Sequence, residues 1–317
     1  MSESELLQQL SAERAALAAS QSARVAAIAV SPRRSVSAIA WRPGLFVSAA
    51  EALAGADQVH IRAGAAGAGT GEAVGEVLAA DPATDVAVIR CTALQGMPIP
   101  VMRSDALRLA ESVLLIGHGW HGPMACFASI SMAAEAWRSR RGGHIDQRIE
   151  IAAPPDERLE GAAIVDMAGR LVAMAVAGAH GRTLGIPAST VERVLAAVVQ
   201  RGYLPRPYLG LRLQRLWLDA AAAARFGRHA RRIPVVAGVD PDSPAAVAGL
   251  EPGDLIETVD DHPVHDIDTL RQALSGPSLP RTLTLGIRRG GLPQQRTLTP
   301  IERAPIESAP TERAQRD

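Results

Sequence analysis

The feature that most constrains the fold is a series of short apolar runs that repeats along the first part of the chain. Each run is too short for a helix and is bounded by Gly, Pro, Asp or Ser, a pattern typical of small antiparallel barrels. One set lies between Val25 and Cys91, and a second continues from Val101 to Ile186. The sequence therefore predicts a mainly β chain with two successive barrels.

Helical and proline-rich patterns divide the chain further. The first residues carry Leu6, Leu7, Leu10 and Leu17 at helical spacing, and a second helix is predicted over Ser189–Gln200, where it closes the second barrel. Two prolines then mark a semi-rigid linker. We expect an N-terminal amphipathic helix (1–20), a double-barrel domain (21–200), the linker (201–207), a mixed α/β domain (208–302) and a disordered tail (303–317).

Charge and hydropathy exclude several classes of partner. The 33 basic residues balance the 33 acidic ones and form no block, so no nucleic-acid partner is expected. No stretch approaches the ~20 apolar residues that a membrane-spanning helix needs. The first residues lack the basic and apolar regions of a signal peptide, which predicts a cytoplasmic location, or a periplasmic one if a leader has been removed.

Three stretches of the sequence resemble a known family. Asp81-Pro82-Ala83-Thr84-Asp85-Val86-Ala87-Val88-Ile89-Arg90 is similar to the D-P-x-T-D-L-A-V-L-K segment of HtrA/Deg trypsin-like serine proteases, and Leu184-Gly185-Ile186-Pro187 resembles the end of their protease domain. The run from Asp240 to Ile256 closely resembles the P-x-S-P-A-x-x-A-G-L-x-x-G-D core of their PDZ domains. The resemblance implies a chymotrypsin-like double barrel followed by one PDZ domain.

The same resemblance places the catalytic triad on unusual residues. The family's histidine base falls on Glu51, its aspartate on Asp85 and its serine nucleophile on Glu160, while Arg158 and Leu159 replace residues of the oxyanion-hole loop. An ordinary Glu is too weak a base to activate a hydroxyl group. We therefore expect no catalytic residues and no cofactor, and interpret the chain as a pseudoprotease rather than an enzyme.

Two alternatives to this interpretation stay open. The chain is a metal-binding protein if Glu51, Asp85 and Glu160 hold a hard cation, or if His118 and His121 belong to a soft-metal site with Met124 and Cys126. The other alternative is a serine protease or hydrolase with an unrecognised nucleophile, such as Ser48 or Ser129.

The PDZ groove is the strongest binding site that the resemblance implies. Its carboxylate loop falls on Tyr208, Leu209, Gly210 and Leu211, and its helix supplies Ile267, Leu270, Arg271 and Leu274. Such a groove binds protein C-termini or extended peptides by strand addition. We expect a peptide-binding adaptor, scaffold or chaperone-like subunit. Because the family assembles through its N-terminal segments, we also expect a homo-oligomer, with a trimer as the first choice.

Overall fold

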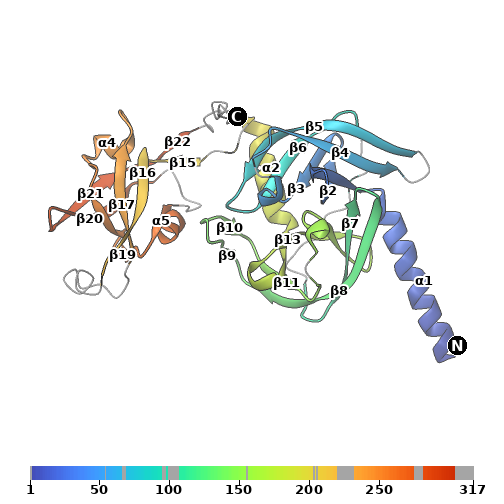
Figure 1. The fold of residues 1–317 in the computed structure, drawn as a ribbon. Helices are drawn as coiled ribbons and strands as arrows, with labels where there is room; N and C mark the ends of the chain where they lie inside the picture. Colours follow the sequence, from blue (N-terminus) through green and yellow to red (C-terminus); the bar gives the residue numbers. More distant parts are fainter. Residues whose placement is uncertain are drawn as a thin grey trace. The chain divides into compact units, whose positions relative to one another are not determined.

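The computed structural model describes residues 2–53, 55–65, 69–94, 98, 107–154, 156–202, 204, 206–219, 232–274 and 281–303. The chain divides into two compact units (Figure 1). The first comprises residues 1–139 and 143–202, and the second is formed mainly by residues 203–317. Of the tail predicted over 303–317, residue 303 belongs to a described strand, β22, and the rest lies outside the described residues.

The first barrel is antiparallel and closes in the order β1-β2-β3-β6-β5-β4. Its core consists of the inward apolar side chains of these strands, among them the fully buried Phe46, Ile61 and Ile89. The short helical turn η1 (Glu51–Leu53) follows β3. The strands are β1 (Val25–Ser31), β2 (Arg34–Arg42), β3 (Leu45–Ser48), β4 (Gln58–Ala65), β5 (Gly69–Asp81) and β6 (Val86–Arg90).

The second barrel closes in the order β11-β14-β13-β12-β7-β8, so the predicted pair of barrels is confirmed. Helix α2 (Ala188–Arg201) follows, buries Val191, Val194 and Leu195, and ends at Gly202 with a left-handed backbone. The strands are β7 (Ser112–Gly119), β8 (Gly122–Ala134), β11 (Arg148–Ile151), β12 (Ala163–Asp166), β13 (Leu171–Ala177) and β14 (Thr183–Pro187), with the turns η3 (Glu157–Leu159) and η4 (Ala179–Gly181) and a small ribbon of β9 (Trp137–Arg138) and β10 (His144–Ile145).

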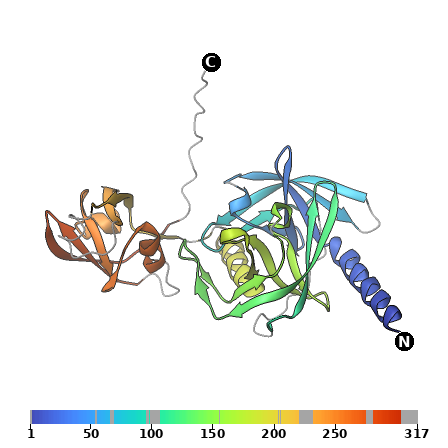
Figure 2. The same cartoon turned by 60° about the horizontal axis from the view of Figure 1, so that its bottom comes forward.

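Helix α1 (Glu3–Ser22) begins with a capping box between Ser2 and Glu5. Its C-terminal part contacts β7 and β8, and Arg14 stacks on the ring of Phe127 at 3.6 Å. Its N-terminal part extends away from the second barrel (Figure 2), and Leu6 and Leu7 are more than half exposed. No helix in the described part of the chain is both long enough and apolar enough to span a bilayer.

The second unit is a mixed α/β domain whose main sheet has the order β16-β17-β18-β20-β21. Its core contains Val236, Leu270 and Leu285, all nearly or fully buried. Part of the predicted linker forms β15, which pairs with β22. The elements are β15 (Arg206–Tyr208), β16 (Leu211–Trp217), β17 (Arg232–Val239), α4 (Pro244–Val247), β18 (Leu255–Val259), β19 (His262–Pro263), α5 (Ile267–Leu274), β20 (Leu283–Arg289), β21 (Leu292–Leu298) and β22 (Ile301–Arg303).

Candidate functional site

Asp85 lies in the turn between β5 and β6 and adopts a left-handed backbone, with φ of 57°. Its Oδ1 accepts a hydrogen bond of 2.8 Å from the backbone amide of Glu51, the first residue of η1. Burial is the main cause that raises the pKa of Asp85 to about 7, and the charges of Glu51 and Glu160 add to it. Asp85 is therefore a carboxyl group that exchanges its proton near neutral pH.

Glu160 comes from the second barrel, where it directly follows η3. Its Oε2 lies 2.9 Å from Nη2 of Arg34, a residue of β2 in the first barrel. Nε of Arg34 also lies 3.0 Å from the carboxylate of Glu157. Burial raises the pKa of Glu160, Arg34 opposes that rise, and the charges of Glu157 and Glu51 contribute to it. The two barrels thus bring Glu51, Asp85 and Glu160 into one electrostatic cluster.

The turn before Glu160 uses its own backbone amides. The amides of Arg158 and Leu159 donate to Oδ1 and to the carbonyl of Asp156, each at 2.9 Å, and the amide of Glu160 donates to the carbonyl of Glu157 at 3.2 Å. The guanidinium group of Arg158 also donates to the two carboxylate oxygens of Asp156, through Nε and Nη2. Leu159 points into the core of the second barrel. The amides at the predicted oxyanion-hole positions therefore donate within this turn.

The two serines considered as alternative nucleophiles lie in different surroundings. Ser48 is fully buried at the end of β3, and its hydroxyl donates to the carbonyl of Ser37 at 2.7 Å. Ser129 is half-buried in β8 and pairs with Ser112 across the ladder. We call the region where Glu51, Asp85 and Glu160 lie the barrel junction. The group there whose pKa is raised to about 7 is Asp85.

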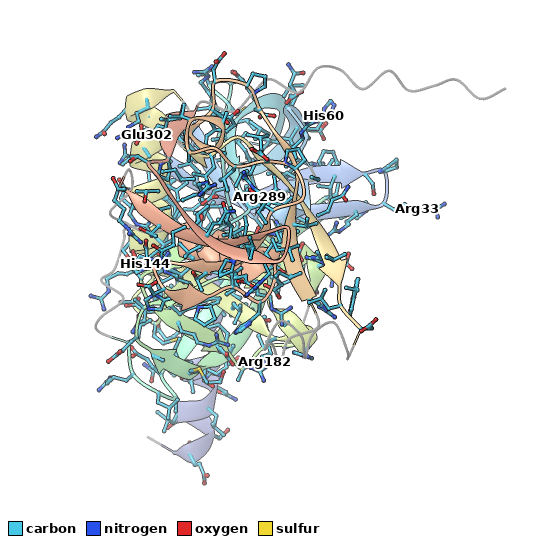
Figure 3. The ribbon with its side chains drawn as sticks, turned by 90° about the vertical axis from the view of Figure 1, so that its left-hand side faces the viewer. Arg33, His60, His144, Arg182, Arg289 and Glu302 are labelled. Carbon is cyan, nitrogen blue, oxygen red and sulfur yellow. The ribbon has the colours of Figure 1, made fainter. Side chains whose placement is uncertain are left out.

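The described residues contain no group of three or more His, Cys, Asp or Glu side chains that could hold a metal ion. His118 is buried in β7, where its Nδ1 lies 2.6 Å from the carbonyl of Gly119, and burial lowers its pKa. His121 is exposed in the following turn. Other histidines, such as His60 in β4 and His144 in β10, belong to separate sheets (Figure 3).

In the second unit, the loop between β15 and β16 is fastened by its carbonyl groups. The carbonyl of Leu209 accepts from the amide of Ala245 at 2.9 Å, and that of Gly210 accepts from the amide of Asp240 at 2.8 Å. Gly210 has φ of +78°, and a Cβ atom there would lie 2.1 Å from Cβ of Ser243. Within the described residues, the amides of Leu209 and Gly210 donate no hydrogen bond, so they are available to an anionic group.

Strand β16 and helix α5 lie next to this loop. We call the loop, the strand and the helix together the β16–α5 site. Among the described strands β16 is an edge, and α5 packs beside it and β17. Leu211 and Leu213 are half-buried on the side of the domain core, whereas Ile267 is 8% exposed and Leu270 is fully buried. Leu270 therefore supports the site from the core. Arg271 and Leu274 belong to α5, but their side chains lie outside the described residues.

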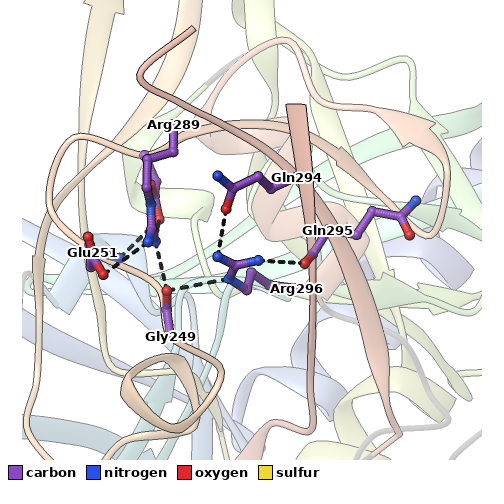
Figure 4. Close-up of polar contacts among 7 residues, drawn as sticks. Gly249, Glu251, Arg289, Gln294, Gln295 and Arg296 are labelled. Carbon is purple, nitrogen blue, oxygen red and sulfur yellow. Dashed lines mark hydrogen bonds and ion pairs between the residues drawn. The ribbon is translucent and has the colours of Figure 1, made fainter. Parts of the chain in front are cut away.

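Arg289 holds the segment that follows α4, and its contacts with Gly249 and Glu251 are drawn in Figure 4. Arg289 binds both carboxylate oxygens of Asp254, at 2.7 and 2.8 Å, and donates to the carbonyl of Gly249, just after α4, at 2.7 Å. The Asp254 side chain is 1% exposed. Burial alone would raise its pKa, but the hydrogen bonds from Arg289 and from the amide of Glu251 outweigh that effect and lower it.

Sequence reasoning missed three residues of these sites. Arg34 and Asp156 hold the turn around Glu160, and Arg289 holds the segment after α4. Their contacts join residues of different elements or depend on the detailed shape of a turn. Only the short spacing of Asp156 and Arg158 offered a signal, because an Asp can cap the turn that follows it.

Comparisons with known proteins identify both domains and support the fold. Residues 36–174 match the trypsin-like peptidase domain family, and residues 235–289 match the PDZ domain family. A structure of the HtrA-type protease AlgW with a tripeptide is 26% identical, with a TM-score of 0.58, and the match covers 92% of this chain and 98% of that one. The predicted mainly β double barrel followed by a PDZ domain is confirmed.

Curated relatives are named as serine endoproteases. The probable periplasmic serine endoprotease DegP-like of Brucella suis is 27% identical over 201 residues, which are 60% of this chain and 38% of that protein. The periplasmic serine endoprotease DegP of Escherichia coli is 27% identical over 221 residues, 67% of this chain and 45% of that protein. The chain thus spans less than half the length of these relatives.

Two sequence predictions are corrected by these relatives. The prediction that the chain is not an enzyme is contradicted, because the relatives are named serine endoproteases and the double barrel that carries their chemistry is retained. The predicted cytoplasmic location is also contradicted, because these relatives are named periplasmic, and the amino acids of the first segment were a poor guide to compartment. The chain contains a trypsin-like peptidase domain and a PDZ domain and is a homologue of the DegP/HtrA serine proteases.

Proposed function

We propose that this HtrA homologue binds protein C-termini or extended peptides at its β16–α5 site and acts as an adaptor, scaffold or chaperone-like subunit. The observation that carries the proposal is the loop of Leu209 and Gly210. Its carbonyls are tied down by the amides of Ala245 and Asp240, while its own amides are available beside an edge strand. A terminal carboxylate accepts hydrogen bonds from such amides, and an extended peptide pairs with the backbone of such an edge strand.

The relatives favour the same assignment and add a location. A relative of this fold, the HtrA-type protease AlgW, has been solved with a bound tripeptide and with a decapeptide. The named periplasmic relatives lead us to propose a periplasmic location. We further propose self-association, because α1 leaves Leu6, Leu7 and Leu10 exposed, and a trimer is the first expectation. We also propose the domain limits expected from the sequence, except that residues 206–207 of the linker and residue 303 of the tail belong to the β15–β22 pair.

The test compares two forms of one peptide on the full-length protein. An eight-residue peptide that ends in valine is titrated as the free acid and as the C-terminal amide. The free acid should bind with micromolar affinity, about −8 kcal/mol, because a few anchors supply most of the free energy of peptide binding. The amide should bind at least tenfold more weakly. Equal affinity of the two forms would refute the assignment of the carboxylate loop.

A glycine variant checks the position of the site. Gly210→Ala places a Cβ atom 2.1 Å from Cβ of Ser243 and should weaken binding of the free acid at least tenfold. Gly290→Ala is the matched control, because Gly290 also has a positive φ, of +55°, in the same domain but its Cβ would meet no atom within 4 Å. The control should bind the peptide as the unmodified protein does.

A second candidate function is hydrolysis of peptide bonds at the barrel junction, which the homology to endoproteases favours. The available chemistry there is that of carboxyl groups, with Asp85 exchanging its proton near pH 7. The test is cleavage of fluorogenic casein by the full-length protein and by Asp85→Asn. This candidate requires cleavage that the substitution abolishes. Cleavage that is unchanged in the variant, or no cleavage by either protein, rejects it.

A further inference from the structure

Two side chains at the far end of the β16–β17 pair are not used by the carboxylate loop. Trp217, the last residue of β16, is 64% exposed. The guanidinium carbon of Arg232, the first residue of β17, lies 4.3 Å from the centre of its ring. An indole that is left exposed on an edge strand gives up apolar burial, and such residues are typical of contact surfaces.

These side chains follow the same face of β16 as the site itself. Successive side chains of a strand point to opposite faces, so Leu211, Leu213, Arg215 and Trp217 share one face. Leu211 and Leu213 pack against the domain core, and Arg215 reaches Asp268 in the first turn of α5 at 3.5 Å. The row therefore changes along the strand, from aliphatic residues beside the carboxylate loop to a cation and an aromatic ring.

Among the described residues, the charges at this end of the strand leave one cation without an acidic partner. Arg215 is paired with Asp268, and both side chains remain largely accessible, at 52% and 39% exposed. Arg232 is exposed and stacks on Trp217, and no acidic side chain pairs with it among the described residues. The group of Arg215, Arg232 and Asp268 thus carries a net positive charge next to an exposed aromatic face.

We propose that Arg215, Trp217 and Arg232 form an upstream subsite that takes acidic side chains of a bound peptide. This proposal rests on the proposed function. A peptide that pairs antiparallel with β16 and places its last residue opposite Leu211 has its fifth residue from the end opposite Arg215 and its seventh opposite Trp217, since the extra residue of the local bulge lies on β17. Side chains at these alternate positions share the face of Leu211 and Leu213.

The experiment uses three eight-residue peptides ending in valine, with Glu, Gln or Lys at both the fifth and the seventh residue from the C-terminus. They are titrated into the full-length protein at low and high salt. The Glu peptide should bind about fivefold tighter than the Gln peptide and more than fivefold tighter than the Lys peptide, and the preference should shrink at high salt because these charges are exposed. The double variant Arg215→Gln/Arg232→Gln should reduce the preference for Glu over Gln to less than twofold.

Two control variants separate this effect from general damage. Arg296→Gln removes one positive charge from β21, the opposite edge of the described sheet, and Leu216→Ala changes the opposite face of β16. Both should keep the fivefold preference. If all three free-acid peptides bind equally to the unmodified protein, or if the preference survives in the double variant, the subsite is refuted while the carboxylate loop stands. If free-acid and amidated peptides bind alike, both proposals fail.

Discussion

The ion pair between Asp254 and Arg289 gives a measurable effect of a single substitution in the PDZ domain. A hydrogen bond to a charged group contributes ~1.5–3 kcal/mol, and the Asp254 side chain that makes these bonds is 1% exposed. Arg289 is 27% exposed and keeps the carbonyl of Gly249 and the carboxylate of Glu251, so its charge is not left buried without a partner. We expect Asp254→Asn to lower the free energy of unfolding of this domain by about 2 kcal/mol.

Native-state hydrogen exchange read by mass spectrometry measures this change in the full-length protein. A loss of about 2 kcal/mol speeds the exchange of amides in β18 and β20 by about thirtyfold, since each 1.4 kcal/mol is a factor of ten. Exchange in the two barrels should not change and serves as an internal reference. Glu251→Gln is the matched control: Glu251 also contacts Arg289 but is 63% exposed, so ~0–1 kcal/mol is expected. An Asp254→Asn protein with exchange like that control would show that the pair contributes no more than a surface contact.

Two further predictions concern the first unit. The folded-state pKa of Asp85, about 7, lies above its unfolded value of ~3.9, so its contribution to stability is fully present below pH ~4 and is lost as the pH rises toward 7. Asp85→Asn should therefore raise the melting temperature relative to the unmodified protein at pH 8 but not at pH 4. Parallel pH profiles of the two proteins would count against the raised pKa. Replacing Leu6, Leu7 and Leu10 by Ser should convert the full-length protein from an oligomer to a single chain in light scattering, because these side chains are exposed on α1; a single-chain mass for the unmodified protein would reject self-association through this helix.

The architecture was predictable because it depends on local patterns. Short apolar runs between turn residues become the strands of closed barrels, and the glycine of the predicted carboxylate loop is required by a positive φ and a close approach to Ser243. Ser243 itself caps α4, as its position before Pro244 indicates. These features involve residues close in sequence, or a single stereochemical requirement, and a sequence shows both.

The contacts that define the sites were not predictable in the same way. Arg34 and Glu160 are separated by 126 positions, and the chain has 33 basic residues from which a partner could come. The stacking of Arg232 on Trp217 depends on the register of β16 with β17, which contains a bulge. Such pairs follow from the closure of barrels and the pairing of strands, and no local rule selects them.

The two domains also differ in which atoms carry the family's chemistry. In the PDZ domain the proposed ligand contacts are backbone amides of Leu209 and Gly210, so most side chains around them can change while the contacts remain. At the barrel junction the chemistry belongs to side chains. The junction can therefore keep its barrels while its side chains change. In this chain it holds the carboxyl groups of Glu51, Asp85 and Glu160, and the pKa of Asp85 is raised to about 7. Sequence similarity consequently predicts backbone recognition more directly than it predicts the chemistry between the barrels.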